Sequence, residues 1–326
     1  MKKPHSKYYR TFDKLKDESH RPQWSVIIPT YNCAKYLEQT LKSVLLQDSG
    51  DDQMEIIVVD DCSTKDDPKS VVQNVAGSRV RFYQQKENVG KSRNYEYGIA
   101  KSKGYYIHLL HGDDVVKPGF YKEMNRLFEL FPSAGAAFCH CIYINNQNSY
   151  IGESKILGEE AMLLKDFSKD IAKWQLIQPP CLVIKREVYE TVGGYDRRLH
   201  YIEDWEYYVR CSLNYDFAYS PQPLAEYRIF PENSSSRSAK GGRRLKTLKK
   251  VLKIMDAYLP ETLLKDIKSK RNQEVAQYCL DYIPKMVYTK DVKGFVLYSK
   301  TFFFRNRKPR LWLRWFRFVI QFKKFK

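Results

Sequence analysis

Short apolar runs alternate with longer amphipathic segments through the first two thirds of the chain. The runs at residues 24–29, 55–59 and 105–110 have the length and composition of buried strands. Residues 34–47 and 91–100 repeat apolar positions every three or four residues, as a helix with one buried face does. The pattern continues with predicted strands at residues 79–83, 136–144, 181–184, 217–219 and 225–229 and a helix from Pro118 to Leu130. Strands alternating with helices predict an α/β fold with a central, mostly parallel sheet.

A polar, turn-rich segment at residues 231–242 divides the chain. It follows the predicted α/β domain, residues 21–230, which is preceded by a charged N-terminal tail, residues 1–20. Residues 243–326 show helical periodicity and predict a helical C-terminal region.

The net positive charge of the chain lies in residues 231–326. Residues 231–326 carry 25 Lys+Arg and 7 Asp+Glu, an excess equal to the whole net charge of +18, so the first 230 residues are neutral. In the tail, residues 305–326, polar and mostly basic positions form one stripe of a helix, and Trp, Phe, Leu and Ile side chains form the rest. Such a helix is typical of a segment lying in an anionic membrane surface, and it also suits a helix packed on the protein's own core. No basic recognition motif accompanies the charge, so no nucleic-acid partner is expected.

The cysteines and the N-terminus indicate a cytoplasmic protein. The seven cysteines are odd in number and form no CxxC pair, which favours buried free thiols over a disulfide framework or a zinc site. The N-terminus lacks the apolar stretch of a signal peptide, and no apolar run reaches the roughly 18 residues of a spanning helix.

Two acidic pairs follow predicted strands, Asp60–Asp61 after the second and Asp113–Asp114 after the fourth. Open α/β sheets bind ligands at the carboxyl ends of their strands, so the sequence predicts that these four carboxylates converge. Like charges at close range repel, and a divalent cation with oxygen ligands, Mg²⁺ or Mn²⁺, relieves the repulsion and binds substrate phosphates. The alternative is that the aspartates only cap turns and helices.

Six motifs occur in the order and spacing of a known family. They are VIIPTYN (Val26–Asn32), VVDDCST (Val58–Thr64), ENVGKSRN (Glu87–Asn94), HGDD (His111–Asp114), GGYD (Gly193–Asp196) and IEDWE (Ile202–Glu206). This set resembles the motifs of the family 2 glycosyltransferases, and the resemblance covers about residues 24–230. It implies the GT-A fold, with a sugar nucleotide as donor.

The resemblance also implies roles for individual residues. The nucleotide would be bound by Pro29, Thr30, Tyr31, Asp61, Arg93 and Asp113. Asp61 would accept a hydrogen bond from the base ring, and Asp113 would face the donor sugar or the ribose. Asp114 would hold the metal ion, and Asp204 would be the catalytic base.

The base assignment carries a physical tension. Asp204 is predicted at a helix N-terminus, where the helix dipole keeps the pKa of a carboxyl low and weakens it as a base. Desolvation by Trp205 would raise that pKa again. Glu203 is the alternative base, and the alternative for Asp204 is an ordinary helix cap.

The chain departs from the family pattern at two positions. His111 replaces the first acidic residue of the common DxDD signature, and Phe230 stands where a histidine is frequent, which puts a further histidine contact in doubt. Arg228 and Ser234–Ser236 are candidates for contact with the diphosphate. Tyr195 either stacks on an acceptor sugar or packs in the core below a turn.

Together these features predict an inverting glycosyltransferase that moves a sugar from a nucleotide-diphosphate donor to an acceptor hydroxyl. The expected donor is a UDP-sugar. The expected products are cell-surface polysaccharide or lipid-linked glycans, made at the inner face of the plasma membrane. Two alternatives remain open: a nucleotidyltransferase-like enzyme on a related fold, and an inactive membrane- or polyanion-binding protein.

Overall fold

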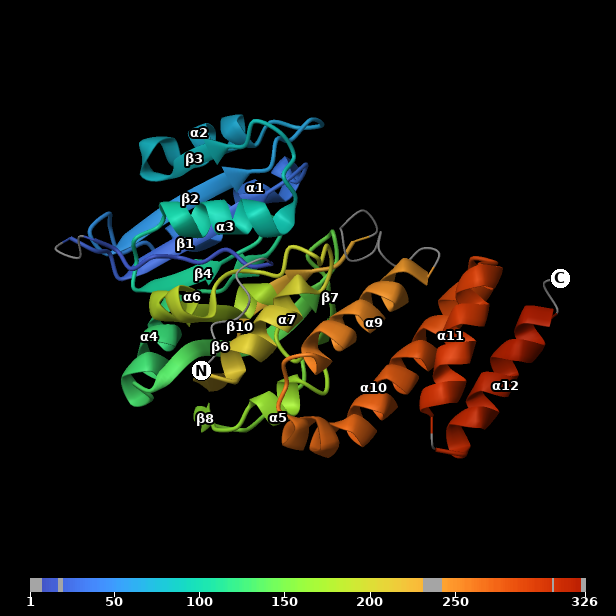
Figure 1. The fold of residues 1–326 in the computed structure, drawn as a ribbon. Helices are drawn as coiled ribbons and strands as arrows, with labels where there is room; N and C mark the ends of the chain where they lie inside the picture. The colour runs from blue at the N-terminus through green and yellow to red at the C-terminus, as the bar shows by residue number, and fades with distance from the viewer. Residues whose placement is uncertain (1–7, 17–19, 231–241, 307, 324–326) are drawn as a thin grey trace. The chain divides into compact units, whose positions relative to one another are not determined.

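The computed structural model describes residues 8–16, 20–230, 242–306 and 308–323 (Figure 1). The chain forms two compact units, one made of Met1–Phe167 with Leu176–Phe230 and the other of Ser168–Gln175 with Pro231–Lys326. The second unit therefore includes Ser168–Gln175, a short segment from within the predicted α/β domain. Residues 231–241, nearly all of the predicted linker, lie outside the described residues, and so do Ser234–Ser236.

One ten-stranded sheet forms the framework of the first unit. Its first four strands, in the spatial order β3 (Arg81–Gln84), β2 (Met54–Asp60), β1 (Trp24–Thr30) and β4 (Tyr106–Leu109), pair in parallel. Every residue of β1 and β2 is buried, and for β2 the apolar run at residues 55–59 predicts a strand covered on both faces.

Beyond β4 the sheet becomes mixed. The strand β9 (Leu182–Lys185) lies antiparallel between β4 and β6 (Ala134–Ile144), and β6 pairs in parallel with β10 (Asp216–Arg228). Three short antiparallel strands complete the sheet: β5 (Val115–Val116), β7 (Tyr150–Glu153) and β8 (Met162–Leu164).

The two predicted late strands, residues 217–219 and 225–229, are one strand, β10. The pairing of β10 with β6 shifts register between Ser220 and Pro223 and again between Pro223 and Ala225. Prolines cannot donate to a sheet ladder, so the sequence suggests a break there, but such irregularities let the strand continue past them.

Helices cover both faces of the sheet. Leu37 and Leu41 of α1 (Ala34–Leu45) join the same apolar core as Val26 and Ile28 of β1. On the other face, α3 (Lys91–Lys101) approaches β1 closely at Gly98, where an added Cβ would lie 2.5 Å from Ile27. The remaining helices of this unit are α2 (Pro68–Ala76), α4 (Phe120–Leu130), α6 (Arg186–Val192) and α7 (Glu203–Ser212). All seven cysteines are free, and five of them are buried as the sequence predicts, whereas Cys33 and Cys62 are partly exposed.

The predicted N-terminal tail is in part a packed segment, which the sequence analysis did not foresee. Phe12 is buried, with its ring 6.0 Å from that of Tyr189. The Arg10 carbonyl accepts a hydrogen bond from the Gly194 N–H at 2.8 Å, and the Arg210 guanidinium lies 4.0 Å from the Tyr9 ring. These contacts fasten residues 8–12 to the first unit.

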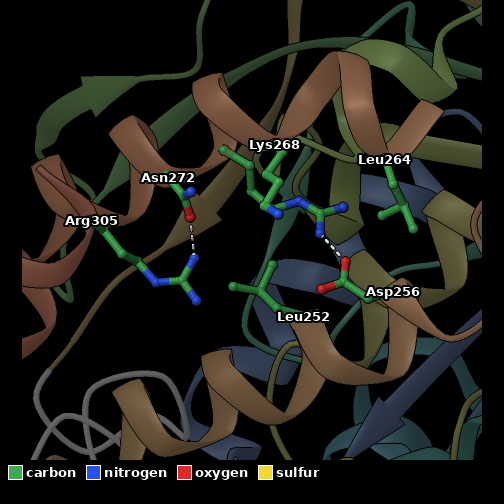
Figure 2. A pocket seen from close by; sticks show the side chains of 7 residues that line it. Leu252, Asp256, Leu264, Lys268, Asn272 and Arg305 are labelled. Carbon is green, nitrogen blue, oxygen red and sulfur yellow. Dashed lines mark hydrogen bonds and ion pairs between the residues drawn. The ribbon is translucent and has the colours of Figure 1, made fainter. Parts of the chain in front are cut away.

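The second unit is helical, as the sequence predicts. It contains the short α5 (Ser168–Ile171), α9 (Arg243–Asp256), α10 (Glu261–Tyr288), α11 (Val292–Arg305) and α12 (Arg310–Lys323). Residues of α9, α10 and the end of α11 surround a cavity of about 260 Å³ (Figure 2). In the described parts of the chain, no helix has both the length and the apolar character needed to cross a membrane.

Packing divides the apolar side chains of α12 into two groups. Trp312 and Trp315 both contact the Phe303 ring of α11, each with ring centroids 4.5 Å apart. Leu313 and Phe316 are 70% and 52% exposed. The predicted apolar face therefore packs partly on the protein itself and partly faces solvent.

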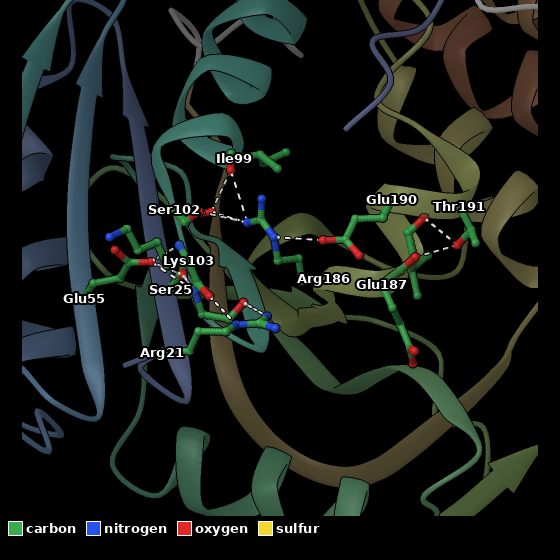
Figure 3. Close-up of polar contacts among 12 residues, drawn as sticks. Arg21, Ser25, Glu55, Ile99, Ser102, Lys103, Arg186, Glu187, Glu190 and Thr191 are labelled. Carbon is green, nitrogen blue, oxygen red and sulfur yellow. Dashed lines mark hydrogen bonds and ion pairs between the residues drawn. The ribbon is translucent and has the colours of Figure 1, made fainter. Parts of the chain in front are cut away.

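A polar network closes the sheet at the amino ends of β1 and β2 (Figure 3). Glu55 accepts hydrogen bonds from Ser25 and from the Lys103 N–H. Arg186, 4% exposed, donates from Nη1 to the Ser102 carbonyl at 2.8 Å, beyond the C-terminus of α3, and from Nε to Glu190 at 3.1 Å. A cation at this end of a helix satisfies terminal carbonyls. The opposite, carboxyl ends of the strands carry the acidic motifs.

Candidate functional site

The carboxyl end of β1 lies between the two acidic loops. The Asp61 N–H donates to the Thr30 carbonyl at 2.9 Å, and the Gly112 N–H donates to the Pro29 carbonyl at 3.0 Å. An added Cβ on Gly112 would lie 3.1 Å from Cys33 Sγ and 3.3 Å from Thr30 Cβ, so the loop after β4 packs tightly on the end of β1. The loops that follow β2 and β4 are therefore neighbours, as expected for adjacent parallel strands.

Both members of the first acidic pair accept hydrogen bonds from turns. Asp60 accepts hydrogen bonds from the Ser63 hydroxyl at 2.5 Å and the Ser63 N–H at 2.9 Å, so it forms the turn after β2. Asp61 accepts from the N–H groups of Val89 and Gly90 at 2.7 and 3.0 Å, which fixes the turn before α3. The prediction that all four carboxylates converge is thus wrong for this pair, because both side chains bind turns and neither belongs to the group of close ligand atoms formed by His111, Asp113 and Asp114.

The second acidic pair forms a compact cluster with a histidine. Potential ligand atoms of His111, Asp113 and Asp114 lie within 4.8 Å of one another. The Arg228 N–H donates to Asp114 Oδ1 at 2.8 Å. Asp114 Oδ2 is buried and has no hydrogen-bond partner among the described residues, and His111 Nδ1 lies 3.7 Å from it.

Burial disfavours the charged form of all three side chains in this cluster. Burial raises the pKa of Asp113 to about 6, and burial together with the charge of Asp113 raises the pKa of Asp114 well above its usual range. Burial and the nearby Lys91 lower the pKa of His111 to about 3, which keeps the ring neutral. The nearby cations Arg228 and Lys91 lower these pKa values but do not offset the effect of burial, and the imidazole beside the two carboxylates is neutral.

These residues fit a divalent metal ion. The unpartnered Asp114 Oδ2 is a free oxygen ligand, and a cation there would favour the ionised form of both aspartates. His111 Nε2 lies 3.0 Å from the Tyr95 hydroxyl. A neutral ring that donates its Nε2–H to Tyr95 leaves the Nδ1 lone pair toward Asp114, and such a second hydrogen bond is typical of metal-binding histidines.

The first turn of α7 lies near the same tyrosine. After burial, the charges of Glu203, Asp204 and Asp113 are the largest causes of the raised pKa of Tyr95, so all three carboxylates lie within electrostatic range of this side chain. Glu203 Oε1 pairs with Lys91 Nζ at 2.7 Å. Asp204 is half-buried, and its Oδ1 accepts from the Trp205 N–H at 2.9 Å.

The backbone before α7 is strained. Ile202 has a φ of +56°, a left-handed conformation that is rare for a β-branched residue. Such strain is common at functional sites, where it fixes the direction of neighbouring side chains. Here it precedes Glu203 and Asp204 directly.

The predicted nucleotide-binding residues lie around the carboxyl end of β1. Pro29 and Thr30 are buried there, and Tyr31 is 40% exposed just beyond them. Arg93 lies in the first turn of α3, one turn after the Asp61-bound loop, with an exposed side chain. The structure thus brings these residues to one edge of the sheet.

Three predicted site residues are buried in supporting positions. Arg228 is 1% exposed and donates to the Asp113 carbonyl and to Gln39 Oε1, both at 2.8 Å. Tyr195 and Trp205 are each 1% exposed. Burial favours core packing for Tyr195 over stacking on a sugar, and support of the aspartate loop for Arg228 over contact with a diphosphate.

The sequence analysis missed three members of the site. His111 was noted only as a departure from a signature, although its spacing to Asp113 and Asp114 could have suggested a shared ligand set. Tyr95 and Lys91 carry no such signal, because their roles depend on contacts with His111 and Glu203.

A parallel α/β sheet with an acidic, metal-compatible cluster at its carboxyl edge defines a class of proteins that bind phosphate-bearing ligands there. The model of one family, described as "Glycosyl transferase family 2", matches residues 25–193. The chain belongs to the family 2 glycosyltransferases, which confirms the resemblance found in the sequence.

Curated relatives agree with this assignment. An uncharacterised glycosyltransferase of Methanocaldococcus jannaschii is 25% identical over 215 residues, 65% of this chain and 72% of the relative. An uncharacterised glycosyltransferase of Haemophilus influenzae is 24% identical over 264 residues, 79% of this chain and 83% of the relative. The chondroitin synthase of Escherichia coli is 31% identical over 145 residues, which are 43% of this chain and 20% of that one.

Solved structures confirm the fold. S. aureus TarS in complex with UDP-GlcNAc has a TM-score of 0.62 at 18% identity, over 92% of this chain and 80% of that chain. The mannosyltransferase PcManGT of Pyrobaculum calidifontis, in complex with GDP-Man and Mn²⁺, has a TM-score of 0.57 at 18% identity, over 99% and 90% of the two chains. The predicted GT-A fold is thereby confirmed.

Proposed function

We propose that this glycosyltransferase is an inverting enzyme that uses a divalent metal ion and a nucleoside-diphosphate sugar. The observation that carries the proposal is the compact cluster of His111, Asp113 and Asp114: His111 contacts the Tyr95 hydroxyl, and Glu203 and Asp204 lie within electrostatic range of the same tyrosine. Fold relatives that hold UDP-GlcNAc, or GDP-Man with Mn²⁺, support it. UDP is the first candidate nucleotide from the family resemblance, and the donor panel described below tests GDP and dTDP against it.

The nucleotide would lie along the carboxyl end of β1, against Pro29, Thr30 and Tyr31. Each carboxylate oxygen of Asp61 accepts one hydrogen bond, Oδ1 from the Val89 N–H and Oδ2 from the Gly90 N–H. Both oxygens keep a lone pair that could accept a hydrogen bond from an N–H of the nucleotide base. Arg93, exposed in the first turn of α3, would reach the nucleotide as a charged donor.

The metal ion, Mn²⁺ or Mg²⁺, would be held by Asp114, with Asp113 and His111 beside it. Bound there, it would neutralise the charge that develops on the departing diphosphate. Arg228 would keep the aspartate loop in position through its contacts with Asp113 and Asp114.

Asp204 is the proposed base. Glu203 is 2% exposed and already paired with Lys91, whereas Asp204 is half-buried and so more accessible to an acceptor. The Asp204 carboxylate would take the proton of the acceptor hydroxyl as its oxygen bonds to the anomeric carbon. The bond from that carbon to the diphosphate oxygen breaks, and the nucleoside diphosphate leaves with the bonding electrons.

The test is nucleotide release by the purified full-length protein across UDP-, GDP- and dTDP-sugars, with Mn²⁺, with Mg²⁺ and with EDTA. Asp204→Asn is expected to lower kcat by about 10²–10⁴, the usual contribution of a general base. Asp52→Asn, at an exposed position in the turn before β2, is the matched control and should leave the rate unchanged.

Four outcomes would contradict the proposal. Full activity of Asp114→Ala would remove the metal assignment, and full activity of Asp204→Asn would remove the base. Formation of a nucleoside triphosphate and a sugar 1-phosphate when pyrophosphate is added to the NDP-sugar, in place of nucleoside diphosphate release, would indicate a nucleotidyltransferase. A product that retains the anomeric configuration of the donor would exclude the inverting mechanism.

We also propose that α12 holds the enzyme at the anionic inner face of the plasma membrane, where it would extend cell-surface or lipid-linked glycans. Leu313, Phe316 and Ile320 follow helical spacing and are 70%, 52% and 58% exposed. Arg310 and Arg317 are exposed on the same helix, and each cation near an anionic surface adds about 1 kcal/mol of attraction.

Co-sedimentation with vesicles tests this second proposal. Deletion after Asn306, or Leu313→Glu together with Phe316→Glu, is expected to abolish binding to vesicles that contain phosphatidylglycerol. Leu46→Glu, which changes a leucine that is 79% exposed in the first unit, is the control. Undiminished vesicle binding by the α12 variants would refute the role of this helix.

A further inference from the structure

The cavity of the helical unit is lined by one face of each contributing helix. Its lining residues are Leu252 and Asp256 of α9, Leu264, Lys268, Arg271 and Asn272 of α10, and Arg305, the last residue of α11. Three of them are cations and one is a carboxylate, so the lining carries a net charge of +2. Figure 2 shows the labelled polar side chains directed toward the same opening.

Arg271 is the buried centre of this lining. Its side chain is 6% exposed. Nε donates to the Ala172 carbonyl at 2.9 Å, and Nη1 contacts Asp256. Nη2 is also buried and has no hydrogen-bond partner among the residues that the structure describes. Because leaving a buried charged donor unsatisfied is costly, this atom is suited to an acceptor from a ligand.

The other two cations come from separate helices. Arg305 Nη1 donates to Asn272 Oδ1 at 2.5 Å, which holds the guanidinium against the cavity wall (Figure 2). Lys268 is exposed and lies at the rim. Leu252 and Leu264 add apolar surface to the same lining.

We propose that this cavity binds a terminal phosphate group. A phosphate monoester carries a charge of about −1.5 to −2 and three strong acceptor oxygens, which match a lining of net charge +2 with three cationic side chains. Arginines bind such oxygens with paired donors, and the Nη2 of Arg271 supplies an unused one. The two leucines would contact the first carbons of the esterified group. The site is separate from the proposed sugar-transfer chemistry and does not depend on it.

Phosphate of this kind has two sources, a lipid headgroup and a soluble phosphate ester. The volume of about 260 Å³ accommodates the phosphate and a short carbon segment, but not a whole lipid. A lipid would therefore present only its headgroup to the cavity, and both sources present the same chemistry to Lys268, Arg271 and Arg305.

The experiment compares purified full-length variants in two binding assays. Glycerol 3-phosphate is titrated calorimetrically, and vesicles of phosphatidylcholine with and without phosphatidic acid are co-sedimented. Lys268→Gln and Arg305→Gln are each expected to weaken binding about tenfold or more, as loss of a charged hydrogen bond does. Lys265→Gln is the matched control, because Lys265 is on the same helix but outside the lining and pairs with Glu261 at 2.8 Å.

The outcomes are distinct. If the protein binds glycerol 3-phosphate and both lining variants weaken this binding, the result supports a soluble phosphate ester as ligand. If both variants weaken binding only to vesicles that contain phosphatidic acid, the result supports a lipid headgroup. Absence of both kinds of binding, equal loss in Lys265→Gln, or unchanged binding in both lining variants overturns the proposal. Far-UV circular dichroism checks that each variant folds. Because Lys268 is exposed, Lys268→Gln should fold and remains informative even if Arg305→Gln does not fold. Nucleotide release, measured separately, reports on the sugar-transfer proposal alone.

Discussion

Asp114→Asn should make the metal-free protein more stable than the wild type, but it should reduce the stability that metal ion and nucleotide add. In the wild type, Asp114 Oδ2 is buried, unpartnered among the described residues and 3.7 Å from His111 Nδ1. An unsatisfied buried polar group costs about 1–3 kcal/mol, and more when it is charged. The asparagine keeps an oxygen for the Arg228 N–H and presents a neutral NH₂ to the neutral His111 ring. We therefore expect the metal-free variant to be more stable than the wild type by about 1–3 kcal/mol.

Metal ion and nucleotide should offset most or all of this difference in stability. A ligand that binds only the folded state at 100 times its Kd stabilises the protein by about 2.7 kcal/mol. The wild type should gain this amount with Mn²⁺ and UDP, and Asp114→Asn should gain much less because it lacks the anionic oxygen. Urea unfolding in EDTA and then in Mn²⁺ with UDP measures both effects, with Asp52→Asn as control. A variant that is less stable than the wild type in EDTA, or that gains as much from the ligands, would refute this reasoning.

Three further predictions concern the framework. Arg228→Met removes the side-chain bonds to Asp113 and Gln39 and should lower the free energy of unfolding by about 3 kcal/mol, and Arg228→Lys should not restore it, because lysine lacks the forked donors; urea unfolding tests both. Burial lowers the pKa of His108 to about 3, so between about pH 6.5 and 3 the unfolded chain binds a proton that the folded protein does not. The free energy of unfolding should therefore decrease as the pH is lowered through this range, by up to about 1.4 kcal/mol per pH unit. His108→Gln should flatten that slope, and a slope identical to that of the wild type would count against the assignment. Arg186→Met should destabilise by about 3 kcal/mol in urea while nucleotide release per folded molecule stays constant.

The parallel half of the sheet could be predicted from the sequence because local pattern determines it. The strands β1 and β2 are buried on both faces, so each appears as an uninterrupted apolar run with an observed boundary one residue from the predicted one. The antiparallel β9 could not be assigned a place, since four residues of apolar sequence do not indicate that it lies between β4 and β6. The continuity of β10 was missed because two prolines within it suggest a break.

The site was predictable only where motifs mark it. Asp61, Asp113 and Asp114 follow strands, and strand ends meet at one edge of a parallel sheet, so their neighbourhood follows from topology. The contact between Arg228 and Asp114 joins residues 114 positions apart through pairing at the far end of the sheet. Nothing in the local sequence specifies such a contact. The assignment of Asp60 to a turn depends on hydrogen-bond geometry with Ser63, which the pair Asp60–Asp61 does not reveal.

The packed N-terminal segment changes where a shortened version of this enzyme should begin. The family match starts at residue 25, but Tyr9 covers the guanidinium of Arg210, a buried α7 residue that pairs with Glu206 at 2.7 Å. A fragment trimmed to the matched region would expose that ion pair to water and loosen the helix that carries Asp204. Fragments for crystallisation or assay should therefore start before Tyr8, and affinity tags are better joined to the chain well ahead of it.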